Sequence, residues 1–387
     1  MRKYYLDNIR WLTVMLVVIY HVIYMYNGII TDGVIGPFYE KQYWDGIQYI
    51  LYPWFMILLF IVAGMCSHYY LETHTIREFV CARTEKLLVP STVGLLSIGW
   101  VQGYINMEIS GAFSAIPETL PKLALYFIMA LSGTGVLWFI QMLWLFSMIL
   151  AMLLSLARKV EKEKTCRTGQ RIPSEVPESG FLSRTVLSWI YAHRGTDILT
   201  LILLAIPVYW SGLILNAPVI VVYRFGIYGF TYFLGYFVFS REETVICISR
   251  YRNSLLAGAA LLAGVYLFLH YGDNYAAAPA VNCFSAIAYA WIACLAAIGC
   301  MKKWGNAMTG FTSFMAKRSF GLYVFHYLPL SATAYGLRKF TGLSALPCYL
   351  LTAFAAFAGG LIMYETISRI PLLRWCVLGI KKHPNPR

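Results

Sequence analysis

The sequence predicts an all-α, polytopic integral membrane helix bundle with about ten transmembrane helices. Of the 387 residues, 59% are apolar and only 13% are charged, about half the charged share of a soluble domain. The apolar residues gather in runs of about 20, the length that spans the hydrocarbon core of a bilayer. The chain also holds 11 Trp, 29 Tyr and 23 Phe, and the ring residues Trp and Tyr are enriched at membrane interfaces.

Ten apolar runs give the expected spans in order. They lie at 9–27, 47–71, 87–105, 136–157, 197–215, 218–239, 254–271, 281–301, 319–337 and 345–367. A shorter apolar piece at 121–133 is expected to be a further re-entrant or interfacial element. The hydrophilic stretch 158–194 is typical of a linker because it is polar and contains Pro and Gly. We therefore expect a single domain over 1–387, with 158–194 as a cytoplasmic linker between the fourth and fifth helices.

The first apolar run differs from a cleaved signal peptide. Asp7 and Arg10 interrupt its start, His21 lies in its middle, and no small-residue cleavage site follows. We expect this run to be retained as the first membrane helix.

The net charge of +13 is explained by topology rather than by nucleic acid. Basic residues concentrate in the even-numbered connections and at both ends of the predicted bundle. The odd-numbered connections hold only Lys41, Lys122, Arg338 and Lys339. Because cytoplasmic loops carry an excess of Lys and Arg, the pattern predicts a multi-pass plasma-membrane protein with both termini in the cytoplasm. The Arg338/Lys339 pair is the one discordant loop.

The nine cysteines show no Cys-x-x-Cys pair and no His/Cys ligand spacing, so the sequence predicts no metal site. Cys283 and Cys348 are both expected near the outer face, where we interpret them as packing residues rather than as a disulfide.

The first helix carries the main chemical signal. Arg10 and His21 are eleven residues apart, which places them about 20° apart on one helix face and about 16.5 Å apart along the axis. Asp7, one turn earlier, is expected to orient the Arg10 guanidinium. A histidine about halfway through the membrane usually marks a pathway or a site, and imidazole suits proton transfer near neutral pH. A histidine bonded to a neighbouring helix for packing alone is the structural alternative.

A second signal lies after the second helix. Arg83 and Lys86 are three residues apart, so they share one face of a helix at the cytoplasmic entrance of the third span. Cations in such a place suit phosphate groups. A positive-inside anchor with no ligand explains the pair equally well.

These residues resemble the membrane acyltransferase-3 family, whose mark is Arg-x10-His. Five segments fall in the family's order: Leu6 to Arg10 followed by His21; Phe55 to Gly64; Phe79, Arg83, Lys86 and Pro90; Leu137-Trp138-Phe139-Ile140; and Ser319 to His326. They cover essentially the whole chain and are similar to the branch of glucan succinyltransferases. Two positions depart from the pattern, since Ala63 replaces a frequent Ser and Lys86 replaces an Arg, which removes the bidentate guanidinium.

The resemblance implies an O-acyltransferase that moves an acetyl or succinyl group from cytoplasmic acyl-CoA to a hydroxyl of an outward-facing or lipid-linked carbohydrate. Acyl-CoA is then a co-substrate, and no permanently bound cofactor is expected. Arg10, Arg83 and Lys86 would hold the CoA phosphates, with Arg10 also counted with His21 as catalytic. His21 would act either as general base or as covalent acyl carrier. Some relatives finish the transfer with an appended esterase domain, so a downstream transfer partner is a further expectation.

Three further residues are candidates for lining the same cavity. They are His326, Arg224 and Trp138, each with a structural alternative: a helix-packing bond, a helix-end carbonyl and an interfacial anchor. A proton-coupled transporter or exporter that uses the Arg10/His21 pair is the chief functional alternative.

Overall fold

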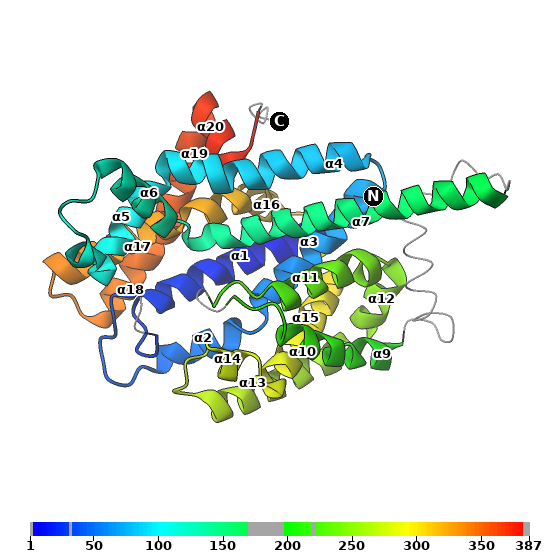
Figure 1. Cartoon of the computed structure of the whole chain (residues 1–387). Coiled ribbons are helices and arrows are strands. Elements are labelled where there is room, and N and C mark those ends of the chain that lie inside the picture. Colours follow the sequence, from blue (N-terminus) through cyan, green and yellow to red (C-terminus); the bar gives the residue numbers. More distant parts are fainter. Residues whose placement is uncertain (1–2, 31–32, 169–196, 218–220, 382–387) are drawn as a thin grey trace.

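The computed structural model describes residues 3–30, 33–168, 197–217 and 221–381, and this part of the chain is a bundle of helices with no strand. The helices lie lengthwise beside one another, and α1 runs through the middle (Figure 1). Helix α1 contacts α3, α15, α16, α17 and α18. A helix enclosed in this way is apolar nearly all round, as α1 is apart from Asp7, Asn8, Arg10, Thr13 and His21.

The helices are bounded as follows: α1 Tyr4–Met25, α2 Gly46–Leu51, α3 Phe55–Leu71, α4 Ile76–Arg83, α5 Trp100–Ser110, α6 Lys122–Ser132, α7 Trp138–Thr168, α9 Ile198–Leu203, α10 Ala205–Gly212, α11 Phe225–Leu234, α12 Glu242–Arg250, α13 Arg252–His270, α14 Ala278–Val281, α15 Phe284–Trp304, α16 Gly310–Phe325, α17 Tyr327–Phe340, α18 Ala345–Phe354, α19 Gly360–Arg369 and α20 Pro371–Leu378. Wider π-helical turns at Thr84–Leu88 and Pro90–Gly99 join α4 to α5, and similar turns at Gly235–Phe239 and Ala355–Gly359 extend α11 and join α18 to α19.

The polytopic all-α prediction is confirmed. Seven helical stretches in the described ranges are long and apolar enough to cross a membrane: Tyr4–Met25, Tyr43–Leu71, Ile76–Ser110, Gly135–Val160, Arg252–His270, Phe284–Trp304 and Ala345–Arg369. Two further predicted spans appear as the shorter apolar stretches Ile198–Gly212 and Phe225–Phe239. The predicted element at 121–133 corresponds to α6, which packs against α5.

Two predicted boundaries differ from the structure. The expected span 319–337 breaks at His326, because Pro329 has no N–H to give to the carbonyl of Phe325 and the ladder of helical hydrogen bonds is interrupted there. The expected linker 158–194 starts as helix, since α7 continues to Thr168. Residues 169–194 lie outside the described residues.

A polar cluster ties the start of α1 to two other helices. The Lys3 ammonium lies 2.8 Å from the Glu242 carboxylate of α12, and Lys302 of α15 pairs with the same carboxylate. The hydrogen bonds from Lys3 and Lys302 hold the pKa of Glu242 below its usual range. The resulting stabilisation is therefore present above the ordinary carboxylate pKa and is lost as the pH falls; it is small because the cluster is partly exposed.

Helices α3 and α11 cross closely enough for backbone contact. A Cβ added at Gly64 would lie 2.0 Å from the carbonyl oxygen of Tyr232, and one at Gly235 would lie 2.1 Å from that of Ile61. Small residues permit such close approach between membrane helices. This contact explains why the segment from Phe55 ends in glycine.

We expect Gly64→Ala to destabilise the protein by about 1–3 kcal/mol, the usual cost of overpacking. The measurement is the midpoint of thermal unfolding in detergent. Gly264→Ala in α13 is the matched control, because no heavy atom lies within 4 Å of the added Cβ there. An unchanged midpoint for Gly64→Ala would contradict the close crossing of α3 and α11.

Candidate active site

Helix α1 presents Arg10 and His21 to the same neighbour, α16. Arg10 lines a cavity together with Ser319 and Tyr323 of α16, and His21 hydrogen-bonds to His326, the residue that follows α16. The shared face that the eleven-residue spacing predicts is therefore observed. Because α1 runs from Tyr4 to Met25, His21 lies about one turn before the end of the helix rather than near its middle.

The basic residues of the second motif lie where α4 widens into a π-helical turn. Helix α4 begins with a capping box in which Thr75 and Glu78 satisfy each other's backbone N–H groups. The turn changes register before Pro90, which cannot donate to the carbonyl of Lys86. The Arg83 guanidinium donates a 3.0 Å bond to the Ser67 hydroxyl of α3, which aims its charge inward.

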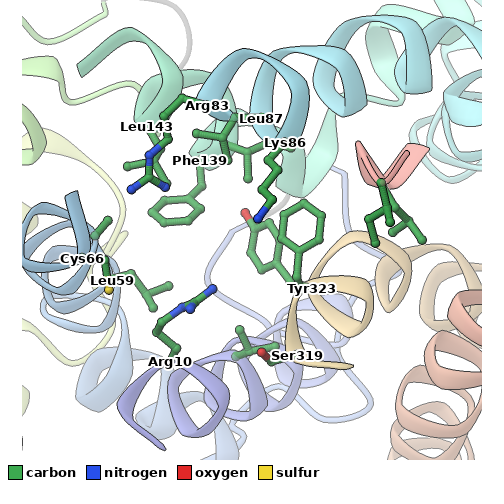
Figure 2. Close-up of a pocket in the computed structure, with 16 residues that line it drawn as sticks. Arg10, Leu59, Cys66, Arg83, Lys86, Leu87, Phe139, Leu143, Ser319 and Tyr323 are labelled. Carbon is green, nitrogen blue, oxygen red and sulfur yellow. The ribbon is translucent and has the colours of Figure 1, made fainter. Parts of the chain in front are cut away.

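Arg10, Arg83 and Lys86 point into one cavity of about 380 Å³ (Figure 2). The cavity lies between α1, α3, the end of α4 with the π-helical turn that follows it, α7, α16 and the end of α20. Its apolar wall includes Val14, Leu59, Leu87, Phe139, Ile140 and Leu143. None of the described residues that line it is acidic. A cavity of this size with three cations and an apolar wall suits a ligand that carries both phosphates and an apolar part.

The charges in the cavity are only weakly neutralised by the protein. Asp7 lies 3.8 Å from the Arg10 guanidinium, beyond hydrogen-bond distance, and the Arg10 side chain is 48% exposed. The nearest acid to Lys86 in sequence, Glu85, is paired with Lys381 instead. Within the described ranges Lys86 has neither a hydrogen bond nor an ion pair. Cationic side chains that no nearby acid neutralises attract an anionic ligand.

Two histidines meet at the other end of the α1–α16 contact. His326 is fully buried, and its Nδ1 lies 2.9 Å from the carbonyl oxygen of Tyr323 and 3.1 Å from that of Leu322. A carbonyl only accepts, so Nδ1 of His326 carries the proton and its Nε2 is left as an acceptor. That Nε2 lies 3.2 Å from Nδ1 of His21.

The same reasoning assigns the tautomer of His21. Its Nδ1 lies 2.8 Å from the carbonyl oxygen of Val17 as well as close to Nε2 of His326. Two acceptors face Nδ1, which therefore carries the proton. Nε2 of His21 keeps its lone pair and has no hydrogen-bond partner among the described residues. This is the state that a general base or a nucleophile requires.

Residues 3–365 match the acyltransferase domain of the acyltransferase-3 family, which is essentially the whole chain. The protein belongs to this family. No curated protein and no solved structure matches the chain. It is thus a multi-pass membrane acyltransferase.

In this acyltransferase the cationic cavity and the histidine pair are separate. The cavity lining ends at Val14 on α1 and Tyr323 on α16 and does not include His21. Two helical turns, or about 10 Å, separate Val14 from His21. An acyl donor bound in the cavity would have to extend along the α1–α16 contact to bring its acyl group to His21.

The last two predicted residues lie away from the cavity. Arg224 is buried and caps the start of α11 rather than lying within a helix; it donates 2.6 Å and 3.4 Å bonds to Asn282 Oδ1 and to the carbonyl of Val281. Trp138 begins α7, with its ring centroid 5.6 Å from that of Tyr228. Neither is among the residues that line the cavity, so both stay predictions as site residues.

Sequence reasoning missed the contribution of the C-terminal helix. Leu378 and Ile380 line the cavity, and Gly379 lies so close to the basic turn that a Cβ there would be 2.1 Å from the carbonyl oxygen of Glu85. Gly379 has φ of 62°, which favours glycine. Pro371 at the first turn and Gly379 just past the end form the usual start and stop pattern of a helix, a signal that could have identified α20.

Proposed function

We propose that the protein is an O-acyltransferase that moves an acetyl or succinyl group from acyl-CoA to a hydroxyl of an outward-facing or lipid-linked carbohydrate. The observation that carries the proposal is the convergence of Arg10, Arg83 and Lys86 on one cavity, on the same side of α1 as His21. Their charges suit the phosphates of CoA, and the apolar wall suits its long arm.

In the proposed reaction, His21 acts at Nε2. The acceptor hydroxyl gives its proton to Nε2 while its oxygen attacks the thioester carbonyl. A C–O bond forms, the C–S bond breaks, and the proton passes to the departing CoA thiolate. His326 and the carbonyl of Val17 hold the Nδ1 proton, which keeps Nε2 ready to accept.

The surroundings of His21 favour a sugar as acceptor. The rings of Tyr20, Tyr327 and Tyr24 lie edge-on to the imidazole with centroid distances of 5.1, 5.2 and 6.4 Å. Aromatic faces with polar tips suit a ligand that has both apolar and hydroxyl-bearing sides.

In the proposed orientation, the protein lies in the plasma membrane and the cationic cavity faces the cytoplasmic side. Both termini would then be cytoplasmic, as the distribution of basic residues favours. The proposal also includes a downstream partner protein that completes the transfer of the acyl group.

The test is transfer by the purified protein in lipid vesicles. Labelled acetyl-CoA or succinyl-CoA is added on the outside, and a lipid-linked or soluble glycan is enclosed. We expect a labelled acyl ester on the enclosed glycan and none in vesicles without protein. Label that crosses the membrane without becoming esterified would overturn the proposal in favour of a transporter.

A further inference from the structure

A second group of reactive side chains lies far along the chain from His21. The Cys283 thiol is 3.3 Å from Nε2 of His270, and Nδ1 of His270 is 3.2 Å from a carboxylate oxygen of Asp273. A nucleophile bonded to a base that is bonded to an orienting acid is the arrangement of acyl-transferring triads. We propose that Cys283, His270 and Asp273 form a second catalytic site, which accepts acyl groups from esters.

The local fold explains how these residues meet. His270 is the last residue of α13 and Cys283 is the N-cap residue of α15, two helices that pack along each other. The turn after α13 brings Asp273 back, with its N–H 3.0 Å from the carbonyl oxygen of His270. Gly272 has φ of 101°, which a residue with a side chain rarely adopts.

The base is held as a catalytic imidazole must be. Asp273 accepts from Nδ1, so Nε2 is the ring nitrogen that can take the thiol proton. The carbonyl oxygen of Ala280, 3.2 Å from the sulfur, is a second acceptor for that proton. The ring of Tyr266, fully buried, packs against the imidazole with centroids 5.1 Å apart. The His270 side chain is 17% exposed and Cys283 is half-buried, so a small ester can reach the thiol.

The position of Cys283 at the start of a helix is a second, independent observation in favour of a catalytic thiol. The thiol lies at the N-terminus of α15, a helix that runs for 21 residues. The first N–H groups of a helix have no partner within it and carry partial positive charge. They provide donors for the oxyanion that forms when a thiol attacks a carbonyl.

The site lies at the end of α1 opposite Arg10. Tyr275, in the same connection between α13 and α15, has its hydroxyl 3.4 Å from that of Tyr20, next to His21. The two sites thus lie towards the same end of the bundle, where an acylated glycan would be released under the proposed function. The triad itself does not depend on that proposal.

The reaction at this site balances as follows. The Cys283 sulfur attacks the carbonyl of an O-acyl ester, its proton passes to Nε2 of His270, a C–S bond forms and the ester C–O bond breaks. The proton then goes to the departing oxygen. Water or a second hydroxyl afterwards attacks the thioester and releases the thiol. The site would therefore remove acyl groups from esters or move them between hydroxyls.

The test uses the purified full chain with 4-nitrophenyl acetate as the ester. We expect nitrophenolate release and an acetyl group on the peptide that contains Cys283, detected by mass spectrometry and removed by hydroxylamine. Cys81, an exposed cysteine of α4, is the internal control. Its labelling should be slower than that of Cys283 by a factor of about ten or more. His21→Ala should leave the labelling of Cys283 unchanged, so the two sites can be judged separately.

Three variants decide the role of each group. Cys283→Ala should lose the label, and His270→Gln should slow it about tenfold or more. Ser285→Ala should retain it, although the Ser285 hydroxyl lies 3.4 Å from the same imidazole nitrogen. Equal labelling of Cys283 and Cys81, an unchanged rate in a folded His270→Gln variant, or acetyl on Ser285 would each overturn the proposal.

Discussion

Replacement of His21 by Asn is expected to lower kcat for acyl transfer by about 10³-fold, within the range for loss of a general base. Asn has no group that takes up a proton at neutral pH, although its amide is close in size to imidazole. The measurement is transfer from labelled acyl-CoA in vesicles, with the protein first shown to be folded by its thermal midpoint.

Binding of the donor provides the internal control for this variant. His21 does not line the cationic cavity, so the Kd for a non-transferable CoA thioether should stay within about twofold of the unsubstituted protein. Unchanged kcat would remove His21 from the reaction. A covalent role would appear instead as an acylated His21 peptide when donor is supplied without acceptor.

His326 is expected to act through His21, as a positioning residue. His326→Leu removes the acceptor for the Nδ1 proton, but the carbonyl of Val17 still holds that proton. We therefore expect a smaller loss of kcat, about tenfold, with little change in KM. His326→Gln should recover part of the loss because its amide oxygen reaches the position of Nε2 and can accept the same bond; equal loss in the two variants would indicate packing alone.

The sequence predicted those parts of the site that depend on a single helix. The face shared by Arg10 and His21 follows from helical geometry, and the meeting of Arg10 with Arg83 and Lys86 was expected from their common side of the membrane. The direct bond between His21 and His326 was not predictable, because it depends on how α1 packs against α16. The same holds for Arg224, whose partners Val281 and Asn282 are distant in sequence.

The bounds of the helices were harder to predict from the sequence than the presence of the helices. Hydropathy treats 319–337 as one run, whereas a single missing N–H at Pro329 divides it and places His326 at the junction. Helix α20 lies outside the ten apolar runs, yet Leu378 at its end and Ile380 just after it line the cationic cavity. Local apolarity identifies what enters a membrane but not which short helices cover a site.

Removal of a cation from the cavity is expected to weaken donor binding strongly. Arg10→Ala should raise the Kd for acyl-CoA about 10- to 100-fold, since a hydrogen bond to a charged group contributes roughly 1.5–3 kcal/mol. Lys86→Glu, which places a negative charge beside the phosphates, should have at least as large an effect. The measurement is calorimetric titration of the detergent-solubilised protein with a CoA thioether.

The matched control is Lys122→Ala, in α6 and outside the cavity lining. This substitution removes the same unit of charge from the whole protein but should leave the Kd unchanged. Salt should weaken binding to the unsubstituted protein more than to Arg10→Ala, because one of the screened contacts is already missing. If Lys122→Ala and Arg10→Ala weaken binding equally, the effect is one of net charge, and the three converging cations do not form a donor site.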